Sequence, residues 1–191
     1  MDPRNRAVIG YKIGKNNPLG ETIPFTISGS QAPIHLDFLH TLDLDHSGEF
    51  LTTSRSTYTL RAEDAETPIA TYDFVREPPN PYPEAHIHLH GQSDALQRML
   101  DSCGLEDRKP ADLHIPVGGR RFRPCLEDII EFCILEELVT PREGWQDALE
   151  RGRHEYHEQQ LRAAVRRFPA QAAEVLTNTG WQVTTPPDSP S

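Results

Sequence analysis

The strongest constraint on the fold is a period-two alternation of apolar and polar residues over residues 34–45. Ile34 and Leu36 fall on one side of this pattern, and His35 and Asp37 fall on the other. A period of two with one apolar side is typical of a half-buried antiparallel strand, because successive side chains of a strand point to opposite faces. The segment therefore predicts a sheet with one face covered and one face polar.

Similar patterns place further strands along the first two thirds of the chain. They are predicted over residues 50–61, 69–76, 85–91 and 113–117, with 7–13 and 22–28 as additional candidates. Helical periods begin at Ser93, at Pro124 and at a capping pattern that starts at Thr140, and Pro169 interrupts the last of these helices. We therefore predict an α+β fold, an antiparallel sheet of about five to seven strands with C-terminal helices packed on one face.

The length of 191 residues suits a single domain, which we expect over residues 1–181. The Pro- and Ser-rich end, residues 182–191, is expected to be a disordered tail. Three cysteines without a C-x-x-C pattern fit a reduced, cytoplasmic setting. No apolar run approaches the roughly 18 residues of a membrane span, so no membrane partner is expected.

The charge of the chain argues against two classes of partner. Lysine and arginine number 19 and aspartate and glutamate 29, which gives a formal net charge of -10. Such a charge disfavours non-specific binding to nucleic acid or to an anionic membrane. A contact with RNA or a nucleotide would have to use local basic clusters such as Arg120, Arg121 and Arg123.

The chemistry is concentrated in the predicted strand over residues 85–91. His86, His88 and His90 alternate with apolar residues there, so their imidazoles are expected on one face, about 6.5–7 Å apart along the strand. A further ligand or catalytic group more often comes from a neighbouring strand, and His114 is the candidate. We therefore name these four histidines as candidate catalytic residues.

Two chemistries fit such a cluster. Three neutral imidazoles with an open position would suit zinc, held by His86, His88 and a third histidine, and zinc lowers the pKa of a bound water to about 7. Without a metal, two imidazoles acting as general base and general acid could cleave a phosphate ester. The sequence leaves open whether any metal is bound, and whether the histidine face is catalytic or merely solvated.

The second chemistry needs a phosphate site near the histidines. Two predicted helix starts offer free backbone N–H groups, one after Gly91 and one in the segment before Pro124. The expected phosphate-binding residues of that second segment are Gly118, Gly119, Arg120, Arg121 and Arg123. If the polar faces of the strands coincide, Asp73 could orient one imidazole and Arg55 could add positive charge.

The remaining histidines are expected to have no chemical role. His35, His40 and His46 are interpreted as surface or turn residues, and His154 and His157 as part of a solvated helix face.

The leading functional hypothesis is a hydrolase of phosphate esters, ribonuclease- or phosphodiesterase-like, acting on RNA or a nucleotide. One alternative is a non-enzymatic protein-interaction module, such as one half of a toxin–antitoxin-like or regulatory pair, with the partner bound by the C-terminal helices. The other is a zinc-dependent hydrolase.

Overall fold

The computed structural model describes residues 6–27, 30–45, 48–62, 64–118 and 123–184. The chain divides into two compact units, Met1–Trp145 and Gln146–Ser191. The single domain over residues 1–181 stays a prediction. Residues 185–191 of the predicted tail lie outside the described part of the chain.

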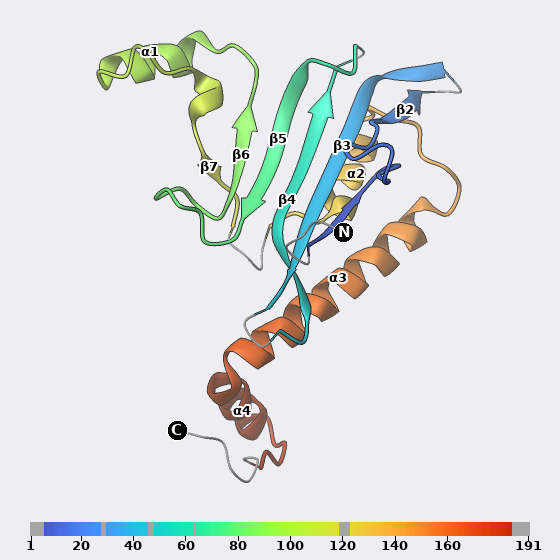
Figure 1. Cartoon of the computed structure of the whole chain (residues 1–191), viewed down its shortest axis with the longest axis vertical. Coiled ribbons are helices and arrows are strands. Elements are labelled where there is room, and N and C mark those ends of the chain that lie inside the picture. The colour runs from blue at the N-terminus through green and yellow to red at the C-terminus, as the bar shows by residue number, and fades with distance from the viewer. Residues whose placement is uncertain (1–5, 28–29, 46–47, 63, 119–122, 185–191) are drawn as a thin grey trace. The chain divides into compact units, whose positions relative to one another are not determined.

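The first unit is built on an antiparallel sheet of seven strands (Figure 1). The strands are β1 (Ala7–Gly10), β2 (Ile23–Ile27), β3 (Ser30–Leu44), β4 (Leu51–Arg61), β5 (Pro68–Val75), β6 (Ala85–Leu89) and β7 (Ile115–Pro116). Their order is β1-β3-β4-β5-β6-β7, and β2 pairs with the other part of β3. The predicted α+β class with an antiparallel sheet is confirmed.

One face of the sheet carries the hydrophobic core. In the strand register Leu36 lies opposite Leu60 and Phe38 lies opposite Tyr58, so the apolar side chains of β3 and β4 share a face. Helix α2 (Leu126–Leu135) packs on this face and buries Ile129 against the sheet (Figure 1). The alternation of the strands gives the sheet one apolar face, and this explains why a helix from the C-terminal half covers that face, as predicted.

Helix α2 is less buried than its sequence suggested. It is apolar nearly all round, which predicted a central buried helix. The structure buries Ile129 and Cys133 but leaves Phe132 39 % and Leu135 67 % exposed. Only the side of the helix that faces the sheet is therefore covered within the described residues.

A small helical segment lies beyond the β6 edge of the sheet. Helix α1 (Asp94–Ser102) begins at Ser93, as predicted, because the Ser93 hydroxyl accepts the N–H of Leu96. The chain then forms the short helix η1 (Pro110–Asp112) and the two-residue strand β7. The predicted strand over residues 113–117 is thus shorter than expected, and His114 lies just before it.

The last two helices are α3 (Trp145–Arg167) and α4 (Pro169–Asn178), and Pro169 separates them as predicted. The predicted start of α3 at Thr140 is wrong. The N–H of Thr140 instead donates to the Thr26 carbonyl oxygen, and Gly144 takes a left-handed conformation with φ of 75°. Because of this long-range hydrogen bond and the turn, the helix begins at Trp145 and not at the predicted capping pattern.

None of the described helices combines the length with the apolar character that a membrane span would require.

Candidate functional site

The polar face of β6 carries the first two residues of the site. Because the strand alternates, Ala85 and Ile87 share the core face while His86 and His88 point to the opposite face. His86 is buried and His88 is half-buried. The prediction that these two imidazoles share a face is confirmed.

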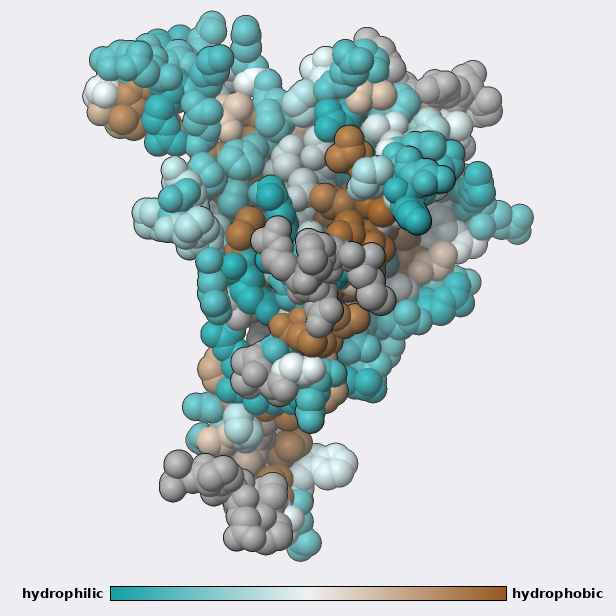
Figure 2. Space-filling view, in the orientation of Figure 1, coloured by the Kyte–Doolittle hydropathy of each residue, from teal (hydrophilic) through white to brown (hydrophobic). Residues whose placement is uncertain are grey.

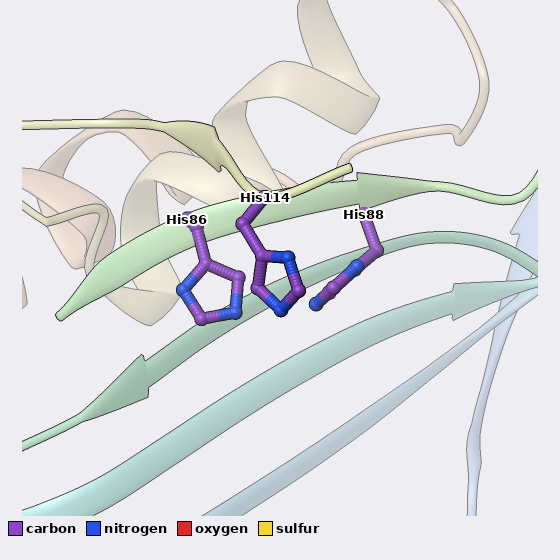
Figure 3. Close-up of side chains that lie close together, drawn as sticks. All are labelled: His86, His88 and His114. Carbon is purple, nitrogen blue, oxygen red and sulfur yellow. The ribbon is translucent and has the colours of Figure 1, made fainter. Parts of the chain in front are cut away.

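His114 joins these two from a different part of the chain. One ring nitrogen of each of His86, His88 and His114 lies within 4.8 Å of the others. The ring centroid of His114 lies 4.7 Å from that of His86 and 4.6 Å from that of His88. Figure 3 shows a nitrogen of each ring turned toward the other two, on the side away from β6. We call these three residues the histidine cluster.

Backbone carbonyl groups fix two of the three rings. The Nδ1 atom of His86 lies 2.8 Å from the Pro83 carbonyl oxygen, and Nδ1 of His88 lies 2.9 Å from that of Ala111. A carbonyl oxygen can only accept, so Nδ1 carries the hydrogen in both rings. In the neutral ring Nε2 then holds the lone pair, which is the tautomer that a metal ligand needs.

The third ring is held by stacking. The rings of Tyr82 and His114 lie parallel, with an interplanar angle of 4° and centroids 3.7 Å apart. Tyr82 belongs to the proline-rich loop before β6, which also contains Pro83, the acceptor for His86. This one stiff loop therefore positions two of the three imidazoles.

The surroundings favour the neutral form of His114. Burial lowers its pKa, and the nearby imidazoles of His88 and His86 lower it further, while a hydrogen bond with the Asp112 backbone acts in the opposite direction. The neutral ring is the form that has a lone pair to offer a metal ion.

The cluster fits a small divalent metal ion with a modest adjustment. In a tetrahedral zinc site the Zn–N distance is about 2.0–2.1 Å, which sets the ligand nitrogens roughly 3.4 Å apart. The separation of up to 4.8 Å would therefore have to close by up to about 1.4 Å. Within the described ranges no fourth His, Cys, Asp or Glu joins the group, so a bound ion would keep an open position.

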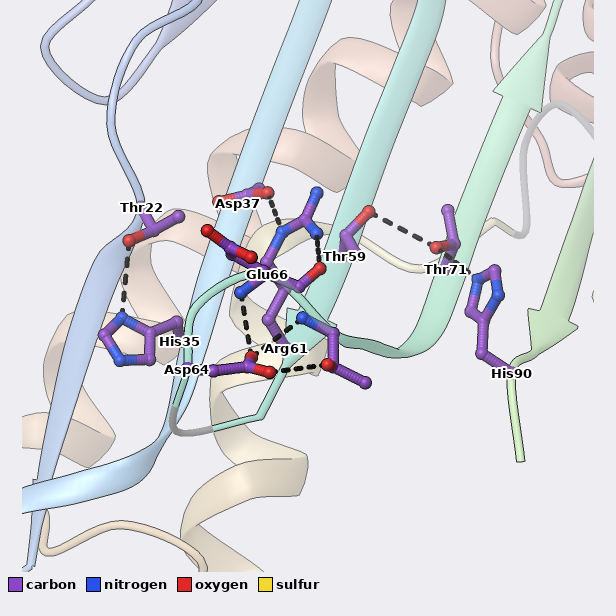
Figure 4. A network of polar contacts seen from close by, with 10 residues as sticks. Thr22, His35, Asp37, Thr59, Arg61, Asp64, Glu66, Thr71 and His90 are labelled. Atoms are coloured by element: carbon purple, nitrogen blue, oxygen red, sulfur yellow. Dashed lines mark hydrogen bonds and ion pairs between the residues drawn. The ribbon is translucent and has the colours of Figure 1, made fainter. Parts of the chain in front are cut away.

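His90 lies apart from the cluster. Strand β6 ends at Leu89, and Nε2 of His90 lies 3.0 Å from the Thr71 hydroxyl (Figure 4). Its ring centroid is 6.4 Å from that of His88. Burial, followed by the charges of His88 and Arg61, lowers its pKa. The catalytic role named for His90 stays a prediction, and the structure does not bring it into the cluster.

Asp73 and Arg55 do share the polar face with the histidines. Asp73 lies opposite His86 in the register of β5 and β6. Its carboxylate accepts from the Thr57 hydroxyl at 2.7 Å and from Arg55 at 3.3 Å. The suggested role of Asp73 in orienting an imidazole is therefore not supported, because the Nδ1 partner of His86 is the Pro83 carbonyl. Figure 2 shows mostly hydrophilic residues on this side over β6 and α1.

Of the five expected phosphate-binding residues, only Gly118 and Arg123 lie within the described part of the chain. Gly119, Arg120 and Arg121 lie outside it, and Gly118 is exposed with φ of 70°. Arg123 is buried with its guanidinium 4.2 Å from the centroid of Phe74.

Arg123 therefore lies on the core side of the sheet. The register places Phe74 opposite Ser56 and Ala85, on the face away from the histidine cluster. The phosphate-binding role named for Arg123 stays a prediction, and the structure does not bring Arg123 to the histidine cluster.

The two helix starts also have acceptors of their own. The first turn of α2 carries Glu127 and Asp128, and the Asp128 carboxylate accepts the N–H of Cys125 at 2.9 Å. Helix α1 is capped by Ser93 and has Asp94 in its first turn. Acidic groups at a helix N-terminus compete with a bound anion for its N–H groups and its dipole.

Two other histidines are more buried than predicted. His35 is 6 % exposed and its Nδ1 lies 3.3 Å from the Thr22 hydroxyl. His40 points to the core face, where its Nε2 lies 2.9 Å from the Tyr58 hydroxyl and burial lowers its pKa. A hydroxyl partner satisfies one nitrogen of each ring, while Nε2 of His35 is buried with no hydrogen-bond partner among the described residues. His46 lies outside the described residues, whereas His154 and His157 are exposed on α3 as predicted.

The cysteines have no bridging role in the structure. Cys125 and Cys133 are buried free thiols, and burial raises the pKa of Cys125 to about 12 and that of Cys133 to about 11. Cys103 is exposed.

The sequence analysis did not find the residues that hold the rings in place. Tyr82 acts through the face of its ring, and Pro83 and Ala111 act through their backbone carbonyls. The type of a residue does not indicate such a role. A tyrosine inside a proline-rich segment next to the histidine strand was the available signal.

Comparisons of this chain with known protein families, with curated proteins and with solved structures find no match.

Proposed function

We propose that the histidine cluster binds a divalent metal ion, with zinc as the best fit, and that the protein is a metal-dependent hydrolase. The observation that carries the proposal is the convergence of His86, His88 and His114 to within 4.8 Å. Imidazole is a ligand type that zinc prefers. The orientation of two rings by carbonyl acceptors adds support, because metal-bound histidines commonly donate their other N–H to such a group.

The number of ligands favours catalysis over a structural role. Structural zinc sites have four protein ligands, while catalytic sites have three and keep a water in the fourth position. Three described ligands leave that position for water, whose pKa falls to about 7 on zinc. Such a water supplies hydroxide at neutral pH for attack on an ester.

Metal-free acid–base hydrolysis of a phosphate ester has less support. It needs an anion site that faces the imidazoles. Arg123 lies on the other face of the sheet, and both helix starts carry acidic residues of their own. The interaction-module alternative stays a prediction, and the exposure of Leu161, Val165 and Phe168 in the second unit is the feature that agrees with it.

The first test is metal stoichiometry and affinity in purified protein. Chelator-treated protein is titrated with Zn²⁺ in a calorimeter, and its metal content is then measured by elemental analysis. We expect one ion per chain, with an affinity that falls by roughly 100-fold or more in His88→Ala and His114→Ala.

The matched controls are His90→Ala and His154→Ala, which remove an imidazole outside the cluster. We expect both to bind Zn²⁺ like the wild type. Binding that survives in His88→Ala, or a wild type without stoichiometric metal, would overturn the site. Hydrolysis of 4-nitrophenyl acetate should disappear with the metal and return when Zn²⁺ is restored.

A further inference from the structure

A second feature occupies the same face of the sheet as the histidine cluster. It is a groove of about 770 Å³ over β3 and β4, lined in part by Thr57, Thr59, Arg55, Arg61 and Asp37. That volume lies within the range of about 300–1,000 Å³ that is common for small-molecule sites. The groove is therefore large enough for a small ligand.

Beside the groove, the edge of β3 pairs with two separate strands. Strand β1 pairs with residues Leu39 to Leu42 of β3, and β2 pairs with residues from Ser30 to Leu36. The chain between β1 and β2 passes the point on β3 where one pairing ends and the other begins. Gly20 in this segment takes a left-handed conformation with φ of 74°. A Cβ atom at Gly20 would lie 2.7 Å from the Tyr11 carbonyl oxygen, so a larger residue would have to move this wall of the groove.

Most charges that line the groove are already paired. The Arg61 guanidinium binds the Asp37 carboxylate and the Glu66 carbonyl oxygen (Figure 4). Glu21 accepts from Lys12 at 2.6 Å. These groups balance one another and leave little charge for a ligand.

Arg55 is also paired, with the Asp73 carboxylate, whereas the Glu66 carboxylate lines the groove without an ion pair to another described residue. The Arg55 side chain is 55 % exposed, and its one hydrogen bond among the described residues is the contact of 3.3 Å with Asp73. A guanidinium has five N–H donors in a fork that matches a phosphate or a carboxylate. Arg55 therefore keeps donors for an anionic ligand in the groove.

The contact of Arg55 with Asp73 lies between the groove and the histidine cluster, and no residue of the cluster lines the groove. Asp73 lies opposite Thr57 on β4 and opposite His86 on β6, and its carboxylate holds both Thr57 and Arg55. Two strand spacings, about 10 Å, separate β4 from β6, and Arg55 lies two residues, about 7 Å, along β4 from the position opposite His86. A ligand that contacts both would therefore span a backbone separation of roughly 12 Å, less the reach of the side chains.

We propose that the substrate is a small ester that carries a second oxyanion, which Arg55 binds while the ester bond lies at the histidine cluster. The proposal rests on the metal site of the proposed function. In the reaction the oxygen of water forms a bond to the phosphorus or acyl carbon, the bond to the leaving oxygen breaks, and a proton of the water ends on that oxygen. The net charge of -10 favours a short anion over a long polyanion.

The test compares paired probes with the Zn²⁺-loaded protein. The phosphate pair is the dinucleotide UpU with and without a 5′-phosphate. The carboxylate pair is mono-4-nitrophenyl adipate and 4-nitrophenyl hexanoate. We expect kcat/KM to favour the member with the second anion by roughly 10- to 100-fold in one pair, and that pair identifies the oxyanion as phosphate or carboxylate.

Variants of Arg55 test whether this side chain causes the preference for the substrate with a second anion. Arg55→Gln should reduce the ratio of kcat/KM within that pair to about one, and Arg55→Lys should retain part of it. The control Arg151→Gln removes an exposed arginine of α3 and should leave the ratio unchanged.

The two proposals fail in different ways. Absence of stoichiometric Zn²⁺ would overturn the metal site and the inference with it. Stoichiometric Zn²⁺ with no preference in either pair, with no cleavage of any probe, or with the preference intact in Arg55→Gln would overturn the inference alone.

Discussion

The two faces of the sheet use the same strands for different purposes. On the core face, Leu36, Tyr58 and Leu60 pack against Ile129 of α2 and are almost fully buried. On the polar face, neighbouring residues of the same strands carry hydroxyls, carboxylates and imidazoles. The alternation of the strands thus separates the part that stabilises the unit from the part that can do chemistry, and a change on one face need not disturb the other.

The largest effect that tests this separation is the loss of a core side chain. Ile129→Ala should lower the free energy of unfolding by about 2–5 kcal/mol, because a 2 % exposed side chain leaves a cavity against the sheet. In metal-free protein His88→Ala should cost no more than about 1 kcal/mol, the usual value of one hydrogen bond. Urea unfolding of both variants measures the difference, and equal losses would contradict the division between the faces.

A smaller effect is expected at Tyr82, which contacts the histidine cluster without being a ligand. Tyr82→Ala should weaken Zn²⁺ binding by roughly tenfold, because His114 loses the ring that holds it. Tyr82→Phe keeps the ring and should bind like the wild type. Calorimetric titration measures both, with Tyr11→Ala as the control tyrosine. An unchanged affinity in Tyr82→Ala would show that the stacking does not position His114.

The smallest effect concerns the histidine on the core face. Burial, followed by the charge of Arg123, lowers the pKa of His40 in the folded protein. The unfolded chain, with an ordinary pKa of about 6.5, therefore takes up the proton first as the pH falls. The stability that neutral His40 contributes is present above about pH 6.5 and is lost below it.

His40→Gln should reduce this loss of stability between about pH 7 and 5. Thermal unfolding at a series of pH values measures it, with the exposed His157→Gln as the control. A parallel pH profile in wild type and His40→Gln would contradict the assignment.

The sequence predicted the features that depend on local side-chain direction. A strand fixes which neighbours share a face, so the core face and the pairing of His86 with His88 followed from alternation alone. His114 was only a candidate from a predicted neighbouring strand, and the structure brings it to the cluster from the residue just before the short strand β7. The start of α3 did not follow from the sequence, since the bond of Thr140 with Thr26 joins distant segments.

The positions of Arg123 and Tyr82 could not be predicted for a related reason. No hydrophobic period of the sequence dictates the direction of either side chain. The Arg123 guanidinium lies over the ring of Phe74, and Tyr82 comes from the proline-rich loop.

The shortness of β7 has a consequence for handling the protein. Its two residues pair with His86 and Ile87, and Pro116 has no N–H to donate. Besides His114, the bond from the Val117 N–H to the Ala85 carbonyl oxygen and that of His88 with Ala111 tie this segment to β6. A bound ion would act as a cross-link there. Once a chelator removes it, the edge of β6 becomes a template for another chain, and we expect metal-free samples to aggregate on storage.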